Sequence, residues 1–157
     1  MSPDGSTVLF RAFPSQSQFT ITEKRQLKSF ARRLSQDVAE GRRFTCLITS
    51  DDELRCLNSQ FLRHDYATDV LSFPSGAGAG ELGDLAISAD RAVAQARKLG
   101  HSRLDEIRIL MLHGILHLTG LDHESDNGEM ARAERKWRVQ LDLPDTLISR
   151  TRKTRSA

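Results

Sequence analysis

The sequence predicts an α+β fold in which a single mixed β-sheet of about four strands packs against helices. Strand-like and helix-like segments are interspersed along the chain without the strict βαβ alternation of a parallel α/β fold. The chain has 157 residues, enough for one domain with its own core. Hydrophobic residues make up 38% of it and charged residues 28%, a balance typical of a globular domain rather than a disordered chain.

The N-terminal part of the chain is predicted to form two strands and two helices. An apolar run at residues 7–10 indicates a short first strand. Thr20 and Glu23 have the spacing of a capping box, and the apolar residues that follow recur at helical period up to Gly41. The apolar run 44–49 indicates a second strand. An acidic segment then opens a second helix, whose apolar residues are Leu54, Leu57, Phe61 and Leu62.

The rest of the domain is predicted to contain two strands followed by three helices. The strands lie at residues 69–73 and 82–88, and the glycine-rich segment 75–80 joins them as a loop. Each of the three helical patterns ends shortly before a glycine or a proline, which are common helix stops. These patterns cover residues 92–99, 104–118 and 130–141.

Charge is distributed unevenly along the chain. Lysine and arginine number 23 and aspartate and glutamate 21, which gives a net charge of +2. Residues 149–157 carry four cations and no acid, so residues 1–148 have a net charge of 19 − 21 = −2. We therefore expect a single domain over residues 1–148 and a basic, disordered tail, which is either an electrostatic arm for nucleic acid or a solubilising terminus. Lys24, Lys28 and Arg32 form either an RNA-facing stripe or a solvated helix face.

Sequence features of secretion and of membrane insertion are missing. The chain has no apolar run long enough to span a bilayer, so no membrane partner is expected. Its first residues have neither the basic nor the apolar region of a signal peptide. Cys46 and Cys56 are too few for a disulfide scaffold and are expected to stay reduced. We therefore expect a cytoplasmic protein.

Three of the five histidines lie close together in the sequence and indicate a metal site. His113 and His117 are spaced i, i+4, so their imidazoles project from one face of a helix about a turn apart. Gly120 allows the chain to leave the helix, and His123 can then return as a third ligand. The helix is apolar nearly all round, where unpartnered polar groups are costly to bury. We predict one zinc ion per chain, held by His113, His117 and His123, with a fourth position open to water or substrate.

The same ligand spacing occurs in the metzincin peptidases, whose helix reads H-E-x-x-H-x-x-G-x-x-H. The glutamate that follows the first histidine is their general base. In this chain that position is Gly114. Without the carboxylate the chain lacks the proton acceptor of the peptidase reaction. A metzincin-like metallopeptidase is therefore the alternative hypothesis rather than the leading one.

The string from His113 to His123, His-Gly-x-Leu-His-Leu-x-Gly-x-Asp-His, resembles the signature of the YbeY family of bacterial endoribonucleases and ribosomal RNA maturation factors. The glycine in place of the peptidase glutamate is part of that signature. An Asn-x-x-Phe step at 58–61 and the segments 68–74 and 82–88 are similar to family segments. The resemblance implies a zinc-dependent endoribonuclease that cleaves single-stranded RNA. It also implies roles in the maturation of small-subunit ribosomal RNA and in ribosome quality control.

One departure from the family pattern concerns an arginine. Many members have an arginine directly after the aromatic of the 58–61 step, where this chain has Leu62 and only then Arg63. An arginine suits this position because its planar guanidinium can bind a phosphate and offset charge in the transition state. The resemblance therefore implies Arg63 as a catalytic residue through a shift of one position. The alternative is a surface arginine at the end of a helix.

The sequence leaves the reaction mechanism open. Activated water or a neighbouring 2′-hydroxyl could attack the phosphodiester, and Asp122 is either a base or a residue that orients a ligand. The alternative to an enzyme is a non-catalytic ribosome-assembly factor in which zinc only ties helix and loop together. Three protein ligands rather than four argue against that alternative.

Overall fold

A computed structural model of the chain describes the central part of its sequence. The described residues are 6–11, 18–62, 68–76, 80–121 and 128–144. The predicted tail at 149–157 lies outside them, so the domain boundary at residue 148 stays a prediction. Within these ranges no helix combines the length and the hydropathy that crossing a bilayer would take.

One mixed sheet of four strands runs through the described residues and confirms the predicted fold class. The order across the sheet is β1-β2-β4-β3. The strands β1 (Thr7–Phe10), β2 (Arg43–Thr49) and β4 (Glu81–Ser88) are parallel to one another, and β3 (Val70–Pro74) is antiparallel to β4. The segment 75–80 joins β3 to β4, as its glycines predict. The edges of the sheet are therefore β1 and β3.

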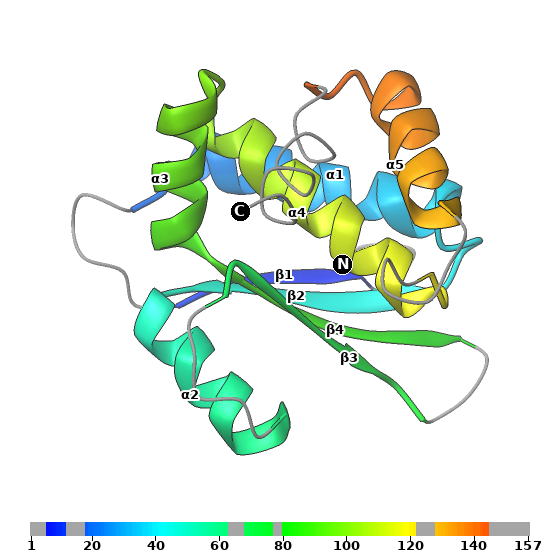
Figure 1. Cartoon of the computed structure of the whole chain (residues 1–157), viewed down its shortest axis with the longest axis horizontal. Coiled ribbons are helices and arrows are strands. Elements are labelled where there is room, and N and C mark those ends of the chain that lie inside the picture. Colours follow the sequence, from blue (N-terminus) through cyan, green and yellow to red (C-terminus); the bar gives the residue numbers. More distant parts are fainter. Residues whose placement is uncertain (1–5, 12–17, 63–67, 77–79, 122–127, 145–157) are drawn as a thin grey trace.

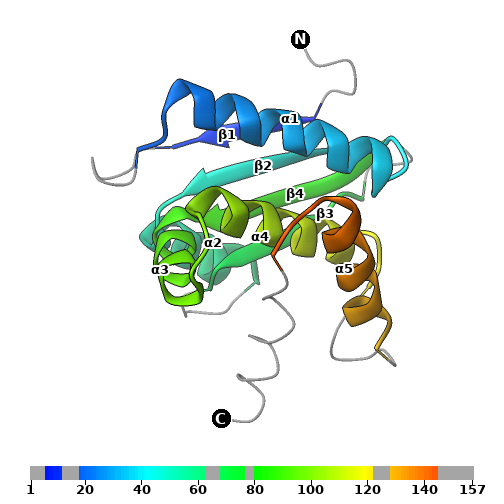
Figure 2. The same cartoon turned by 90° about the horizontal axis from the view of Figure 1, so that it is seen from above.

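The described helices cover the two faces of the sheet unequally. One face is covered by α1 (Ile21–Asp37), α3 (Ala89–Leu99), α4 (Arg103–Leu118) and α5 (Glu129–Gln140), whereas α2 (Asp51–Leu62) lies alone on the other, as Figure 1 shows. Figure 2 shows α4 running between α1 and α5, and all three of α1, α3 and α5 pack against it. The central position in the helical layer belongs to α4, which carries two of the three predicted metal ligands.

The first helix begins as predicted and ends earlier than predicted. Thr20 Oγ1 accepts a hydrogen bond from the Glu23 amide at 3.1 Å, and Glu23 Oε1 accepts one from the Thr20 amide at 2.9 Å, so the capping box is formed. The helix ends at Asp37, because the chain then turns through the left-handed residues Glu40 and Gly41, with φ of 55° and 85°. The glycine therefore marks the end of the turn and not of the helix.

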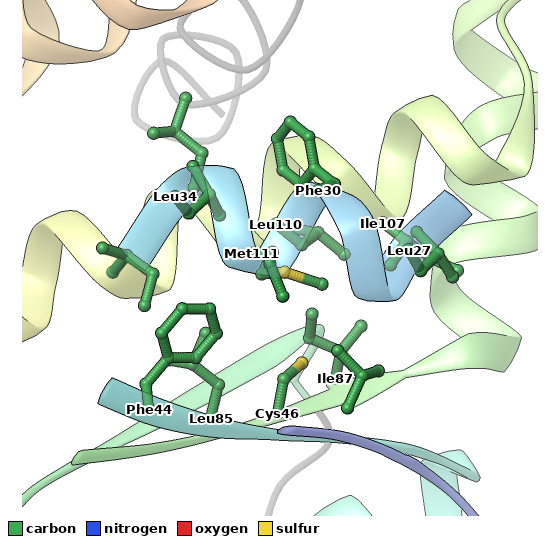
Figure 3. Close-up of a cluster of buried hydrophobic side chains, with 14 of the residues drawn as sticks. Leu27, Phe30, Leu34, Phe44, Cys46, Leu85, Ile87, Ile107, Leu110 and Met111 are labelled. Carbon is green, nitrogen blue, oxygen red and sulfur yellow. The ribbon is translucent and has the colours of Figure 1, made fainter. Parts of the chain in front are cut away.

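The main core lies between the sheet and the pair α1 and α4 (Figure 3). Its apolar side chains come from both helices and from the sheet: Leu27, Phe30 and Leu34 from α1, Ile107, Leu110 and Met111 from α4, and Phe44, Cys46, Leu85 and Ile87 from the sheet. Burial raises the pKa of the Cys46 thiol above its usual range.

Arg103 of α4 forms an ion pair with Glu23 of α1 at 2.8 Å. Partial burial opposes ionisation of Glu23, but hydrogen bonds from Arg103 and Thr20 outweigh this effect and lower the pKa of Glu23. Apolar packing and this ion pair together fix α4 against α1.

A bulge in β4 lies beside the C-terminal end of α4. The register between β2 and β4 shifts at Leu82, which is an extra residue in β4. The next residue, Gly83, has φ of 146°, and a Cβ there would lie 2.4 Å from the carbonyl oxygen of Phe73 and 3.1 Å from Cδ2 of Leu118. Only glycine fits where the end of α4 meets this part of the sheet.

We predict that Gly83→Ala destabilises the fold. The added methyl group would overlap the backbone of β3 and force an L-residue into a strained conformation, so the free energy of unfolding should fall by about 2 kcal/mol or more. Urea denaturation measures this change. The control is Gly76→Ala, because a Cβ at Gly76 meets no atom within 4 Å. Equal midpoints for the two variants would contradict the packing described for Gly83.

Candidate functional site

The helix α4 places His113 and His117 near its C-terminal end. It begins at the N-cap Ser102, whose side chain accepts a hydrogen bond from the Asp105 amide at 3.1 Å. It ends at Leu118, as the sequence predicts, and Gly120 follows two residues later with φ of 105°. The Gly120 amide donates to the His117 carbonyl at 3.0 Å and the Leu121 amide to the Leu116 carbonyl at 3.2 Å, the two bonds of a Schellman motif. The chain therefore leaves the helix directly after the histidine pair.

The two imidazoles converge on one point. His113 Nε2 and His117 Nε2 lie 3.2 Å apart, and the ring planes are inclined at 76° with centroids 4.7 Å apart. The His113 side chain is 15% exposed, so the pair is shielded without being sealed from solvent. The i, i+4 spacing on α4 therefore directs both Nε2 atoms toward one position, as the sequence predicted.

A buried carboxylate, Glu134 of α5, holds the far side of the His113 ring. Its Oε1 is in hydrogen-bond contact with His113 Nδ1, and its side chain is fully buried. Sequence reasoning did not identify this residue. A signal was present, because Glu134 occupies the apolar stripe of its helix together with Met130, Trp137 and Leu141. An acid within a core-facing stripe usually has a specific partner.

The arrangement of the histidine pair suits a zinc ion. With Nδ1 of His113 engaged by Glu134, its Nε2, which faces His117 Nε2, is the ring nitrogen that could bind a cation. Two nitrogens that each lie about 2.0–2.1 Å from one tetrahedral zinc are about 3.3 Å apart, close to the separation of the two Nε2 atoms. Across the described ranges, no three His, Cys, Asp or Glu side chains form a metal-binding group. The predicted third ligand, His123, lies outside those ranges, and so does its neighbour Asp122.

Gly114, the position of the peptidase glutamate, faces the sheet rather than the histidine pair. A Cβ on Gly114 would lie 2.5 Å from Cδ2 of Leu85 in β4. Its carbonyl accepts a hydrogen bond from the Ser72 hydroxyl of β3 at 3.4 Å. The glycine therefore allows α4 to approach β3 and β4 closely, and any side chain at position 114 would have to displace Leu85.

The 58–61 step lies on α2, across the sheet from the histidine pair (Figure 1). Asn58 is buried, whereas Phe61 is 61% exposed and makes an edge-to-face contact with Phe73 of β3. Beside them a cavity of about 530 Å³ is lined by Leu9, Arg11, Thr45, Leu47, Leu57, Phe61, Phe73, Asp84, Leu85 and Ala86. Arg63, which follows α2, lies outside the described residues, so its predicted role stays a prediction.

The chain is similar to members of one named family and to a solved structure. The sequence matches the family described as Endoribonuclease YbeY over residues 13–142. An Endoribonuclease YbeY from Solibacter usitatus is 57% identical over 149 residues, which cover 95% of this chain and 97% of that protein. One from Koribacter versatilis is 58% identical over 107 residues, which cover 68% of this chain and 70% of that protein. The solution structure of TM1509 from Thermotoga maritima matches 83% of this chain and 85% of that chain, with a TM-score of 0.51 and 26% identity.

We predict that Gly114→Glu destabilises the fold. The new side chain would collide with Leu85 and bury a carboxylate without a partner, so the free energy of unfolding should fall by roughly 3 kcal/mol or more. Chemical denaturation of the metal-free protein measures this loss, and Gly76→Glu in an exposed loop is the matched control. A Gly114→Glu protein as stable as that control would show that position 114 is open to solvent.

Proposed function

The chain belongs to the Endoribonuclease YbeY family, and on this basis we propose that it is a zinc-dependent endoribonuclease that cleaves single-stranded RNA. The observation that carries the proposal is the convergence of His113 Nε2 and His117 Nε2, 3.2 Å apart, within the string that resembles the family signature. His123 is the proposed third ligand. We further propose that the substrate is small-subunit ribosomal RNA and that the enzyme acts in the cytoplasm, in rRNA maturation and in ribosome quality control.

The residues of the chain have distinct parts in the proposed reaction. A zinc ion held by the three histidines would supply Lewis-acid polarisation of a phosphate oxygen and activation of water. His113 and His117 present lone pairs from a rigid helix, and three ligands leave one position open to substrate. Arg63 is proposed to offset negative charge on the phosphate in the transition state. Gly114 offers no general base, so peptide hydrolysis is not expected.

The outer face of α1 is the proposed contact for RNA phosphates. Its two acids are already engaged, Glu23 by Arg103 at 2.8 Å and Asp37 by Arg33 at 3.6 Å. The helix also carries Lys24, Arg25, Lys28 and Arg32, so its charge balance is cationic. Phosphate contacts of this kind add affinity without sequence preference. The helix therefore supports the RNA-facing interpretation of the stripe over a merely solvated face.

Removal of one ligand should abolish both metal binding and RNA cleavage. We expect the wild type to bind one equivalent of zinc and to cleave an unstructured RNA but not an unstructured peptide. His117→Ala should lose most of the metal and at least about 100-fold of the cleavage rate, because two imidazoles cannot complete the site. Elemental analysis and cleavage assays measure the two effects.

The matched control is His64→Ala, which removes a histidine outside the proposed ligand set and should change neither quantity. Equal metal content in His117→Ala and wild type would show that the proposed set of metal ligands is wrong. Peptide cleavage with RNA left intact would favour the peptidase alternative, and a metal-loaded protein that cleaves neither would favour the ribosome-assembly alternative.

The electrostatic part of RNA binding should follow the cations of α1. A Lys28→Ala, Arg32→Ala double variant should bind RNA more weakly, and the plot of log affinity against log salt should flatten by about 0.7 for each phosphate that the helix no longer neutralises. Deletion of residues 150–157 should flatten it further if the tail is an electrostatic arm. Lys98→Ala, an exposed cation on α3, is the control. Slopes that stay unchanged in both variants would mean that the stripe is a solvated face and the tail a solubilising end.

A further inference from the structure

The carboxylate of Glu134 lies in an environment that is costly for a charge. Its side chain is fully buried, on the face of α5 that also buries Met130. A buried carboxylate without hydrogen bonds is strongly unfavourable, so its position calls for a specific partner. The partner is His113 Nδ1, which Glu134 Oε1 contacts across the interface between α5 and α4.

This contact determines which nitrogen of His113 carries the proton. An ionised carboxylate only accepts hydrogen bonds, so the nitrogen that faces it must donate. A neutral imidazole has one N–H, and with the proton on Nδ1 the lone pair lies on Nε2. Nε2 is the atom that lies 3.2 Å from His117 Nε2. The carboxylate therefore selects the ring form in which the lone pair of His113 lies on Nε2, the nitrogen that faces His117.

The same contact fixes the two elements that flank His123. The segment 122–127 connects the end of α4 to α5, and Glu134 and His113 join these helices through their side chains. Trp137 of α5 and Leu141, which caps its C-terminal end, pack against the same core as α4. The Glu134–His113 contact therefore joins α5 to α4 at the histidine pair.

We propose that Glu134 is a positioning residue that holds His113 in the Nδ1–H form, with Nε2 directed at the metal, and that joins α5 to α4 at the histidine pair. The proposal rests on the proposed metal site and assigns no direct contact between Glu134 and metal or substrate. Partners of this kind commonly change metal affinity by about 10–100-fold when they are removed.

Nuclear magnetic resonance of the metal-free wild type tests the proposal without any variant. Long-range correlations of the His113 ring should show a protonated Nδ1 and an unprotonated Nε2. In Glu134→Gln the neutral amide can either accept or donate, so the Nε2–H form should become populated. Zinc affinity, measured by competition with a chelator, should fall about 10–100-fold in this variant.

The control is Glu129→Gln, which removes an exposed acid from the same helix and should leave tautomer and zinc affinity unchanged. A wild-type His113 protonated on Nε2 would overturn the proposal, and so would a folded Glu134→Gln protein with wild-type zinc affinity. Both measurements omit RNA, so a failure of the wild type to cleave RNA would contradict the proposed function and not the role of Glu134.

Discussion

The structure depends on the burial of α4 on nearly all of its sides. Nine of its residues, from Glu106 to Leu116, are buried between the sheet and the helices packed on it. In such a layer every polar side chain must be paired. Two histidine–glutamate pairs, one at each end of the helix, supply part of this pairing. His101 Nε2 contacts Glu106 Oε1 at 2.7 Å before the first turns of α4, and His113 contacts Glu134 near the last.

Close packing between α4 and the sheet accounts for the position of the histidine pair and for the glycine at position 114. Two glycines lie at this contact: a Cβ on Gly114 of the helix would lie 2.5 Å from Leu85 of β4, and a Cβ on Gly83 of β4 would lie 2.4 Å from the Phe73 carbonyl of β3 and 3.1 Å from Leu118 of α4. The turn of α4 that carries His113 is therefore pressed onto β3 and β4. The same packing disfavours a glutamate at position 114, because its side chain would have to displace Leu85.

Local sequence signals predicted most of the fold, and tertiary partners account for what they missed. The bounds of β1, the capping box at Thr20 and the left-handed exit at Gly120 were predictable, because each depends on a few adjacent residues. The third helix was predicted from residue 92, but it begins at Ala89, because the Ser88 side chain caps it by accepting from the Arg91 amide. Glu134 was missed since its role depends on a contact 21 residues away. His123 and Arg63 stay predictions.

The central claim is that three imidazoles hold one zinc ion with a position left open. X-ray absorption at the zinc edge of the protein loaded with one equivalent counts these ligands directly. We expect three imidazole nitrogens at about 2.0–2.1 Å and one further light ligand, with no sulfur. A shell with fewer than three imidazoles, or one that includes a thiolate from Cys46 or Cys56, would contradict it.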